Sequence, residues 1–188
     1  EIAKGSDYWA GPAISGTWFN AARNGEGVVV QMLPDGAVFA VWFTYPAEGE
    51  SGDQAWLLGR ATAREADTVT FEALRPLGAR FGTAFDPADV QMTEWGGFEL
   101  QFADCNSATL RYAGPEAYGS GEIALTRFSS LEEIACDGTM KLTERGARSL
   151  DGLRSRSGTW FVPARNGEGW LVEEFADGRT GVYWFTFD

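Results

Sequence analysis

Histidine is absent from this chain of 188 residues, and cysteine occurs only twice. Without histidine, Ser-His-Asp and Cys-His catalytic sites cannot be built, and the usual general base near neutral pH is missing. The same absence excludes a zinc site of cysteine and histidine ligands. Walker and dinucleotide-binding glycine motifs are also lacking. These gaps argue against an enzyme, and the sequence indicates neither a metal site nor a cofactor.

One catalytic option remains, a pair of carboxylates of the kind that glycoside hydrolases use. Glu26, Glu94 and Glu99 are the candidates. Arg23 lies close to Glu26 in the sequence, and its positive charge would lower the pKa of Glu26 and favour an ion pair over a general acid. We therefore predict a protein with no catalytic residue.

Basic residues are scarce: 15 Lys and Arg face 27 Asp and Glu, for a net charge of -12. Phosphate-binding surfaces need positive charge, so we expect neither nucleic acid nor an anionic membrane surface as a partner. No apolar stretch is long enough to span a bilayer, and no signal peptide is visible. The first residue is Glu1 instead of Met, as in a processed or trimmed chain.

Glycine and aromatic residues are abundant, with 24 Gly, 13 Phe and 8 Trp, and apolar residues come in short runs. This composition is typical of many short strands joined by glycine turns. The alternation of apolar and polar residues predicts strands at 16–19, 28–33, 38–45, 54–61, 68–74, 98–102, 109–113 and 122–128. Eight such antiparallel strands close most simply into an up-and-down barrel, which removes exposed edges. A barrel of this size is filled by side chains or holds one small ligand.

The chain also repeats itself. Residues 15–45 (SGTWFNAARNGEGVVVQMLPDGAVFAVWFTY) return without a gap as residues 157–187 (SGTWFVPARNGEGWLVEEFADGRTGVYWFTF). We therefore predict an N-terminal segment (1–14), an all-β barrel domain (15–136), a linker (137–156) and a partial second copy (157–188). The last strand of that copy must pair in its own barrel, with sequence of a longer protein, or with another chain.

Cys105 and Cys136 are either joined by a disulfide or remain two buried free thiols, and we favour the disulfide. Closing a loop of about 30 residues would contribute roughly 3 to 4 kcal/mol in the chain-entropy model. Such a bond implies a periplasmic or extracellular location.

The RNGEG motif occurs in both copies, with Arg23, Asn24 and Glu26 in the first and Arg165, Asn166 and Glu168 in the second. Asn-Gly is typical of a turn with positive φ. In a structural interpretation, an Arg-Glu pair folds over this turn. In a functional interpretation, the three polar side chains project at the barrel mouth and bind a polar ligand or a partner chain. Repetition does not separate the two interpretations.

Aromatic residues gather in the first four strands, and residues 38–45 are apolar on both faces, although a barrel strand needs only one apolar face. The outer face is covered by the N-terminal segment with Tyr8 and Trp9, covered by the linker, or part of an interface. Trp42 and Trp56 are therefore further candidates for binding a ligand or partner.

Two resemblances follow from these motifs. The GTW of residues 16–18 before a strand meander resembles the calycin superfamily of lipocalins and avidins. Arg127 is similar to the arginine that covers the first-strand tryptophan of lipocalins, which implies structural roles for Trp18 and Arg127. The avidin-like opening brings no recognisable set of biotin-contacting side chains.

The second resemblance covers residues 15–136 and again 157–187. The series SGTWF, ARNGEG, DG, WFTY, ADCNSATLRY and GSGEIALTRF resembles an uncharacterised domain family that is common in secreted bacterial proteins, often in tandem copies. This resemblance implies a fold and a compartment, and it implies no activity.

These observations together predict a secreted or periplasmic, non-catalytic barrel module that binds a small molecule, a sugar or a protein partner. The alternative is an extracellular assembly or filament subunit. In that alternative the partial repeat adds strands to a neighbouring chain, and residues 182–187 carry the self-association.

Overall fold

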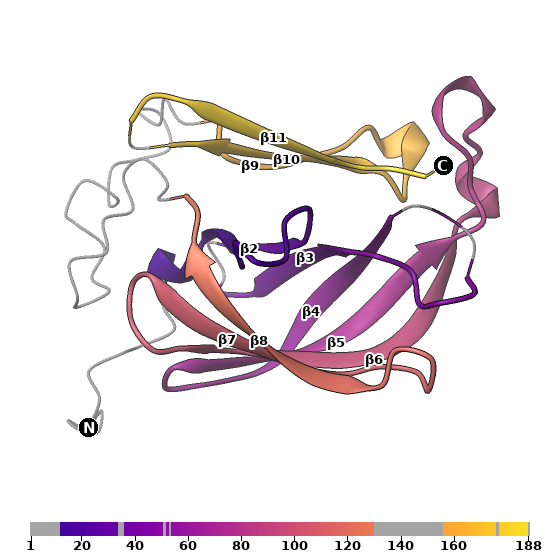
Figure 1. Cartoon of the computed structure of the whole chain (residues 1–188). Helices are drawn as coiled ribbons and strands as arrows, with labels where there is room; N and C mark the ends of the chain where they lie inside the picture. Colours follow the sequence, from indigo (N-terminus) through magenta and orange to yellow (C-terminus); the bar gives the residue numbers. More distant parts are fainter. Residues whose placement is uncertain are drawn as a thin grey trace.

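The computed structural model describes residues 12–33, 36–50, 52, 54–129, 156–175 and 177–187. These residues form a closed antiparallel barrel and a separate three-stranded sheet (Figure 1). The eight barrel strands are β1 Gly16–Phe19, β2 Gly27–Met32, β3 Val38–Thr44, β4 Ala55–Glu65, β5 Thr68–Leu77, β6 Gln91–Phe102, β7 Ser107–Ala113 and β8 Ser120–Arg127. Each strand pairs with the next in the chain, and β1 pairs with β8. The predicted all-β fold with an eight-stranded up-and-down barrel is confirmed.

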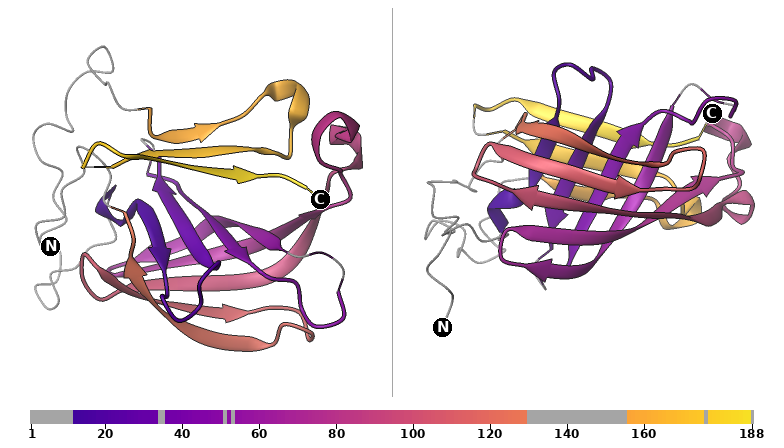
Figure 2. Two further views of the ribbon diagram at one scale, coloured as in Figure 1. Left: turned by 45° about the horizontal axis from the view of Figure 1, so that its top comes forward. Right: turned by 60° about the horizontal axis from the view of Figure 1, so that its bottom comes forward.

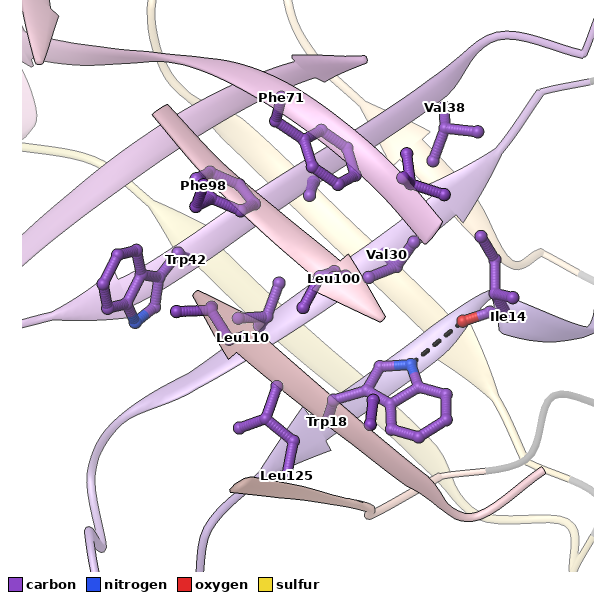
Figure 3. Close-up of a cluster of buried hydrophobic side chains, with 14 of the residues drawn as sticks. Ile14, Trp18, Val30, Val38, Trp42, Phe71, Phe98, Leu100, Leu110 and Leu125 are labelled. Atoms are coloured by element: carbon purple, nitrogen blue, oxygen red, sulfur yellow. Dashed lines mark hydrogen bonds between the residues drawn. The ribbon is translucent and has the colours of Figure 1, made fainter. Parts of the chain in front are cut away.

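Side chains fill the interior of the barrel. Inward-pointing residues of alternating positions, such as Trp18, Phe71 and Leu100, are almost wholly buried (Figure 3). Trp42 packs edge to face on Trp95, with their ring centroids 5.7 Å apart. A barrel of this size either is filled by side chains or holds one small ligand, and this barrel is filled by side chains.

Trp18 and Arg127 hold the closing pair of strands together. They are opposite each other in the β1–β8 register, and the Arg127 guanidinium lies 4.2 Å from the centroid of the Trp18 ring. Arg127 also donates to the carbonyl oxygens of Ala13 at 2.6 Å and Ser15 at 3.1 Å. Trp18 Nε1 donates to the carbonyl of Ile14 at 3.0 Å (Figure 3). The buried indole is thus covered by a cation and tied to the segment that precedes β1.

The second sheet consists of β9 Gly158–Trp160, β10 Gly169–Glu174 and β11 Thr180–Phe185, in the order β11-β10-β9. These strands are the counterparts of β1, β2 and β3 in the repeat. The register is the same in both copies, since Trp18 faces Val28 and the aligned Trp160 faces Trp170. Figures 1 and 2 show this sheet stacked over the outer side of β2 and β3.

β10 and β11 thus cover the outer apolar face of β3, where Val41 is fully buried against them. The sequence leaves three options for this face: the linker, the N-terminal segment with Tyr8 and Trp9, or an interface. Tyr8, Trp9 and linker residues 137–155 lie outside the described ranges. Cys136 does too, so the disulfide to Cys105 stays a prediction.

β6 is longer than predicted, because it begins at Gln91 instead of residue 98. The first four residues of β6 are all exposed. They therefore do not alternate between buried apolar and exposed polar positions, which is the pattern that predicts a strand from sequence. They are held by pairing with β5, whose Leu77 faces Gln91, and a register shift between Ala73 and Leu74 separates this extension from the core pairing. Short 3₁₀ turns lie at η1 Pro12–Ile14, η2 Gly82–Ala84, η3 Pro87–Asp89 and η6 Pro163–Arg165. No helix of the described residues is long and apolar enough to cross a bilayer.

Candidate functional site

The first turn, residues 23–27, joins β1 to β2 and is held by its own side chains. Arg23 Nε donates to Glu26 Oε2 at 2.6 Å, and Thr44 Oγ1 on β3 donates to Glu26 Oε1 at 2.9 Å. The Glu26 side chain is only 6% exposed, so its carboxylate lies beneath the turn. The hydrogen bond to Glu26 raises the pKa of Arg23 above its ordinary value. The first turn thus has the geometry of the structural interpretation, in which an Arg-Glu pair folds over the turn.

The second turn, residues 165–169, repeats this arrangement. Arg165 Nε donates to Glu168, and Thr186 Oγ1 donates to Glu168 Oε2 at 2.8 Å. The Glu168 side chain is 2% exposed. Since an Arg-Glu-Thr brace forms in both copies, the repeated residues encode one braced turn.

A loop of the barrel docks on the second turn. We name residues 81–90, which contain η2 and η3, the 81–90 loop. Arg165 Nη2 donates to the carbonyl of Gly82 at 3.0 Å, and its guanidinium lies 4.4 Å from the centroid of the Phe85 ring. Arginine can combine these two contacts because its planar fork donates at the edge and stacks on its face. The second turn is therefore a docking site for a loop of the barrel.

Glycine permits this approach. Gly167 has a φ of +111°, and a Cβ at this position would lie 2.7 Å from the side chain of Val90. At the aligned Gly25, where φ is +92°, the group that a Cβ would meet is instead the hydroxyl of Tyr45. The two turns thus share a backbone shape, and different residues lie against them.

A cleft of about 310 Å³ opens beside the first turn, between the outer face of the barrel and β11. This volume is at the lower end of the range of about 300 to 1,000 Å³ for ligand pockets. Aromatic and aliphatic side chains form its walls, and polar groups lie among them. The lining comprises Phe19, Val29, Phe43, Phe128 and Tyr183 with Thr17, Asn24, Gly25, Glu26, Gly27 and Gln54.

An apolar layer joins the second sheet to the barrel. Val29 and Val41 of the barrel meet Leu171 and Phe185 of the second sheet, and all four are buried. Trp56 extends the layer, because its ring centroid lies 5.3 Å from that of Phe185. Removing this apolar surface from water is the main force that holds the sheet in place.

Buried polar contacts flank that layer. Glu173 Oε2 accepts hydrogen bonds from Thr17 Oγ1 at 2.8 Å and Ser129 Oγ at 2.9 Å. On the other side, Thr159 Oγ1 donates to Gln31 Oε1 at 2.6 Å. Glu173 is fully buried, and its Oε1 has no hydrogen-bond partner among the described residues. Burial raises the pKa of Glu173 above its ordinary value, although its hydrogen bonds act in the opposite direction.

The predicted binding residues lie in four different places. Trp42 is buried in the barrel core beside Trp95, whereas Trp56 lies in the layer between barrel and sheet. The cleft brings together Asn24 and Glu26, with Arg23 in the same turn. The last group, at the second turn beside the 81–90 loop, comprises Arg165, Asn166 and Glu168.

The three candidate carboxylates are also separate. Glu26 is enclosed under the first turn, Glu94 is exposed on β6, and Glu99 forms a surface ion pair with Arg111 at 3.3 Å. Among the described residues, no group of three or more His, Cys, Asp or Glu is arranged to hold a metal ion. The chemistry that this site offers is flat aromatic surface with a few hydrogen-bonding groups.

Sequence reasoning missed Ser129, Glu173 and the 81–90 loop. Glu173 could have been noticed because the two copies differ at this position: the aligned residue of the first copy is the neutral Gln31. The loop carries three large apolar side chains, Phe81, Phe85 and Val90, in a stretch that otherwise reads as irregular. No sequence pattern identified its partner, because the contact forms only when the two copies meet.

Comparisons with family models, curated proteins and solved structures found no match for this chain. The resemblances to the calycin superfamily and to a secreted tandem domain family therefore stay predictions.

Proposed function

We propose that this chain is a secreted, non-catalytic module of tandem β-barrel repeats that binds its partner in the cleft beside the first turn. The observation that carries the proposal is the cleft, which barrel residues line together with Tyr183 of the second sheet. The filled interior supports it as well, since a ligand has to bind outside the barrel. The partner is a small molecule, a sugar or a segment of protein.

The cleft walls suit a flat or apolar group. Phe128 is 60% exposed, and its ring lies edge to face on Phe19 with their centroids 5.3 Å apart. On another wall, the Phe43 and Tyr183 rings are stacked with centroids 6.3 Å apart. Aromatic faces of this kind contact sugar rings and apolar side chains, and Asn24 adds polar groups at the edge.

The compartment is part of the proposal. Cys105 is not a free thiol in the described part of the chain, which supports the predicted disulfide to Cys136. A disulfide is stable in oxidising compartments, so the bond would place the module outside the cytoplasm. An acidic chain with net charge -12 is consistent with solubility there.

An NMR titration of the full chain with soluble hexasaccharides and with phenylalanine-containing peptides tests this function. We expect chemical shifts to change at Phe43, Phe128 and Tyr183, and Phe128→Ala to weaken binding at least tenfold. Phe161→Ala is the matched control, because Phe161 is 59% exposed and lies outside the cleft lining. If no probe shifts these signals, or if both variants bind equally well, cleft binding is wrong.

Assembly is the second candidate, and one observation favours it. β11 has β10 as its only strand neighbour among the described residues, and Val182 and Trp184 on this edge strand are 60% and 44% exposed. An open edge with apolar side chains can accept a strand of another chain. Light scattering over a concentration series, with negative-stain images, tests this. Discrete oligomers or fibres would support assembly, and a stable monomer would exclude it.

A further inference from the structure

The contacts between barrel and second sheet are reciprocal. We call two residues equivalent when the repeat aligns them, as it aligns Thr17 with Thr159 and Gln31 with Glu173. Thr17 of the first copy donates to Glu173 of the second, and Thr159 of the second copy donates to Gln31 of the first. The same pair of positions therefore meets twice, once in each direction. This is the defining property of an isologous interface with two-fold symmetry.

The apolar layer follows the same symmetry. Val29 and its equivalent Leu171 are both fully buried in this layer. Phe43 stacks on Tyr183, which is the equivalent of Val41. In the opposite direction, Phe185, the equivalent of Phe43, packs in the same cluster as Val41. One surface of the repeat thus packs against a second example of itself.

Among the described residues, only the second of the two turns contacts an 81–90 loop. On the second turn, the 81–90 loop contacts Arg165, and Trp56 Nε1 donates to the carbonyl of Thr186 at 2.9 Å. The two-fold relation places the corresponding loop and tryptophan of a second barrel beside the first turn. The described second copy contains no strand beyond β11, and the 310 Å³ cleft lies at this position.

We propose that the outer face of β1–β3, together with the first turn, is a homotypic docking surface whose partner is the same surface on a second copy of the barrel. In that pair, the 81–90 loop and Trp56 of each barrel fill the cleft of the other. This inference rests on the proposed binding function of the cleft, and it names the partner. Within the present chain, the second sheet occupies the apolar half of the surface and keeps two barrels from pairing.

The test uses a shortened chain that ends at residue 155 and therefore lacks the second sheet. The barrel can stand alone, because its strands close on each other and its core cluster contains no residue of that sheet. We expect analytical ultracentrifugation to give twice the mass of one chain. Val29→Asp should return the mass to that of one chain, whereas Thr70→Asp, on the outer side of β5, should leave the dimer intact. Arg23→Ala should weaken the dimer at least tenfold.

A cross-link tests the two-fold geometry itself. In the symmetric pair, the two Val29 residues face each other, so two Val29→Cys thiols should join under mild oxidation, and two Thr70→Cys thiols should not. A monomeric shortened chain would overturn the proposal, as would a dimer that forms the Thr70→Cys cross-link equally well.

A second variant covers the case in which the shortened chain does not fold. Leu171→Asp in the full chain places a charge in the apolar layer and should release the second sheet from the barrel. We expect this variant to dimerise, and a released but monomeric variant would contradict the inference. If the barrel does not pair while the NMR titration still maps to the cleft, this inference fails and the proposed function stands. If the titration also fails, cleft binding fails independently.

Discussion

Replacing Glu173 with glutamine should remove a pH dependence from the docking of the second sheet. Glu173 is fully buried between barrel and sheet, and one of its carboxylate oxygens has no partner among the described residues. Tyr183 on β11, Thr17 on β1 and Ser129 after β8 face the carboxyl group, and Arg127 is the nearby charge. A buried carboxylate with so few donors is costly, so the neutral acid is favoured when the sheet is docked.

The sign follows from the raised pKa. In the undocked sheet, Glu173 titrates at its ordinary value of 4.5, and in the docked sheet burial raises its pKa above that value. Docking is therefore strongest below pH 4.5 and weakens as the pH rises towards the raised value. Between the two values, one proton is linked to docking, which corresponds to about 1.4 kcal/mol per pH unit. Above the raised value the loss is complete and the profile is flat.

Urea titrations from pH 4 to pH 9, followed by the NMR methyl signals of Leu171 and Val41, measure this docking free energy. We expect the wild-type profile to fall with the stated slope and the Glu173→Gln profile to stay flat, because the amide is neutral, like the equivalent Gln31. Glu174→Gln is the control, since the Glu174 side chain is 17% exposed and pairs with Arg156. Parallel profiles for wild type and Glu173→Gln would refute the reasoning.

Three further substitutions have expected outcomes. Trp18→Ala should lower the free energy of unfolding by about 3 to 5 kcal/mol in urea titrations, because the indole is fully buried in the barrel core. A variant as stable as the wild type would contradict this role. Glu26→Gln should cost about 1.5 to 3 kcal/mol through the lost charge in the turn brace. A fully stable Glu26→Gln chain that no longer binds in the NMR titration would instead favour the functional interpretation. Cys105→Ser should cost about 2 to 5 kcal/mol, and an unchanged melting temperature under reductant would contradict the disulfide.

The barrel was predictable because its signals are local. Alternation along β5, where Val69, Phe71 and Ala73 are buried, indicates one wet face and one dry face. The glycine turns between the strands limit the connections to neighbours, and closure then follows from the need to protect edges. The start of β6 could not be predicted in this way, because the exposed residues at Gln91 and after it depend on pairing with β5.

The site was less predictable, because its contacts join parts of the chain that are far apart. The two apolar faces of β3 indicated that something covers its outer side, and periodicity cannot say what. The second copy of the repeat is the cover, and only the structure shows this, through the reciprocal contacts of Thr17 and Thr159. The buried environment of Glu173 likewise comes from strands of both copies, whereas the sequence around it reads as an ordinary half-exposed strand.

The distribution of the tryptophans has an optical consequence. Trp18, Trp42 and Trp95 are buried in the barrel, whereas Trp56 lies at the boundary and donates to the carbonyl of Thr186, directly after β11. Indole emission shifts to longer wavelengths when water reaches the ring. Release of the sheet therefore changes the Trp56 signal before the barrel tryptophans respond. Single-tryptophan variants would convert these positions into separate fluorescent reporters, one for docking and one for folding.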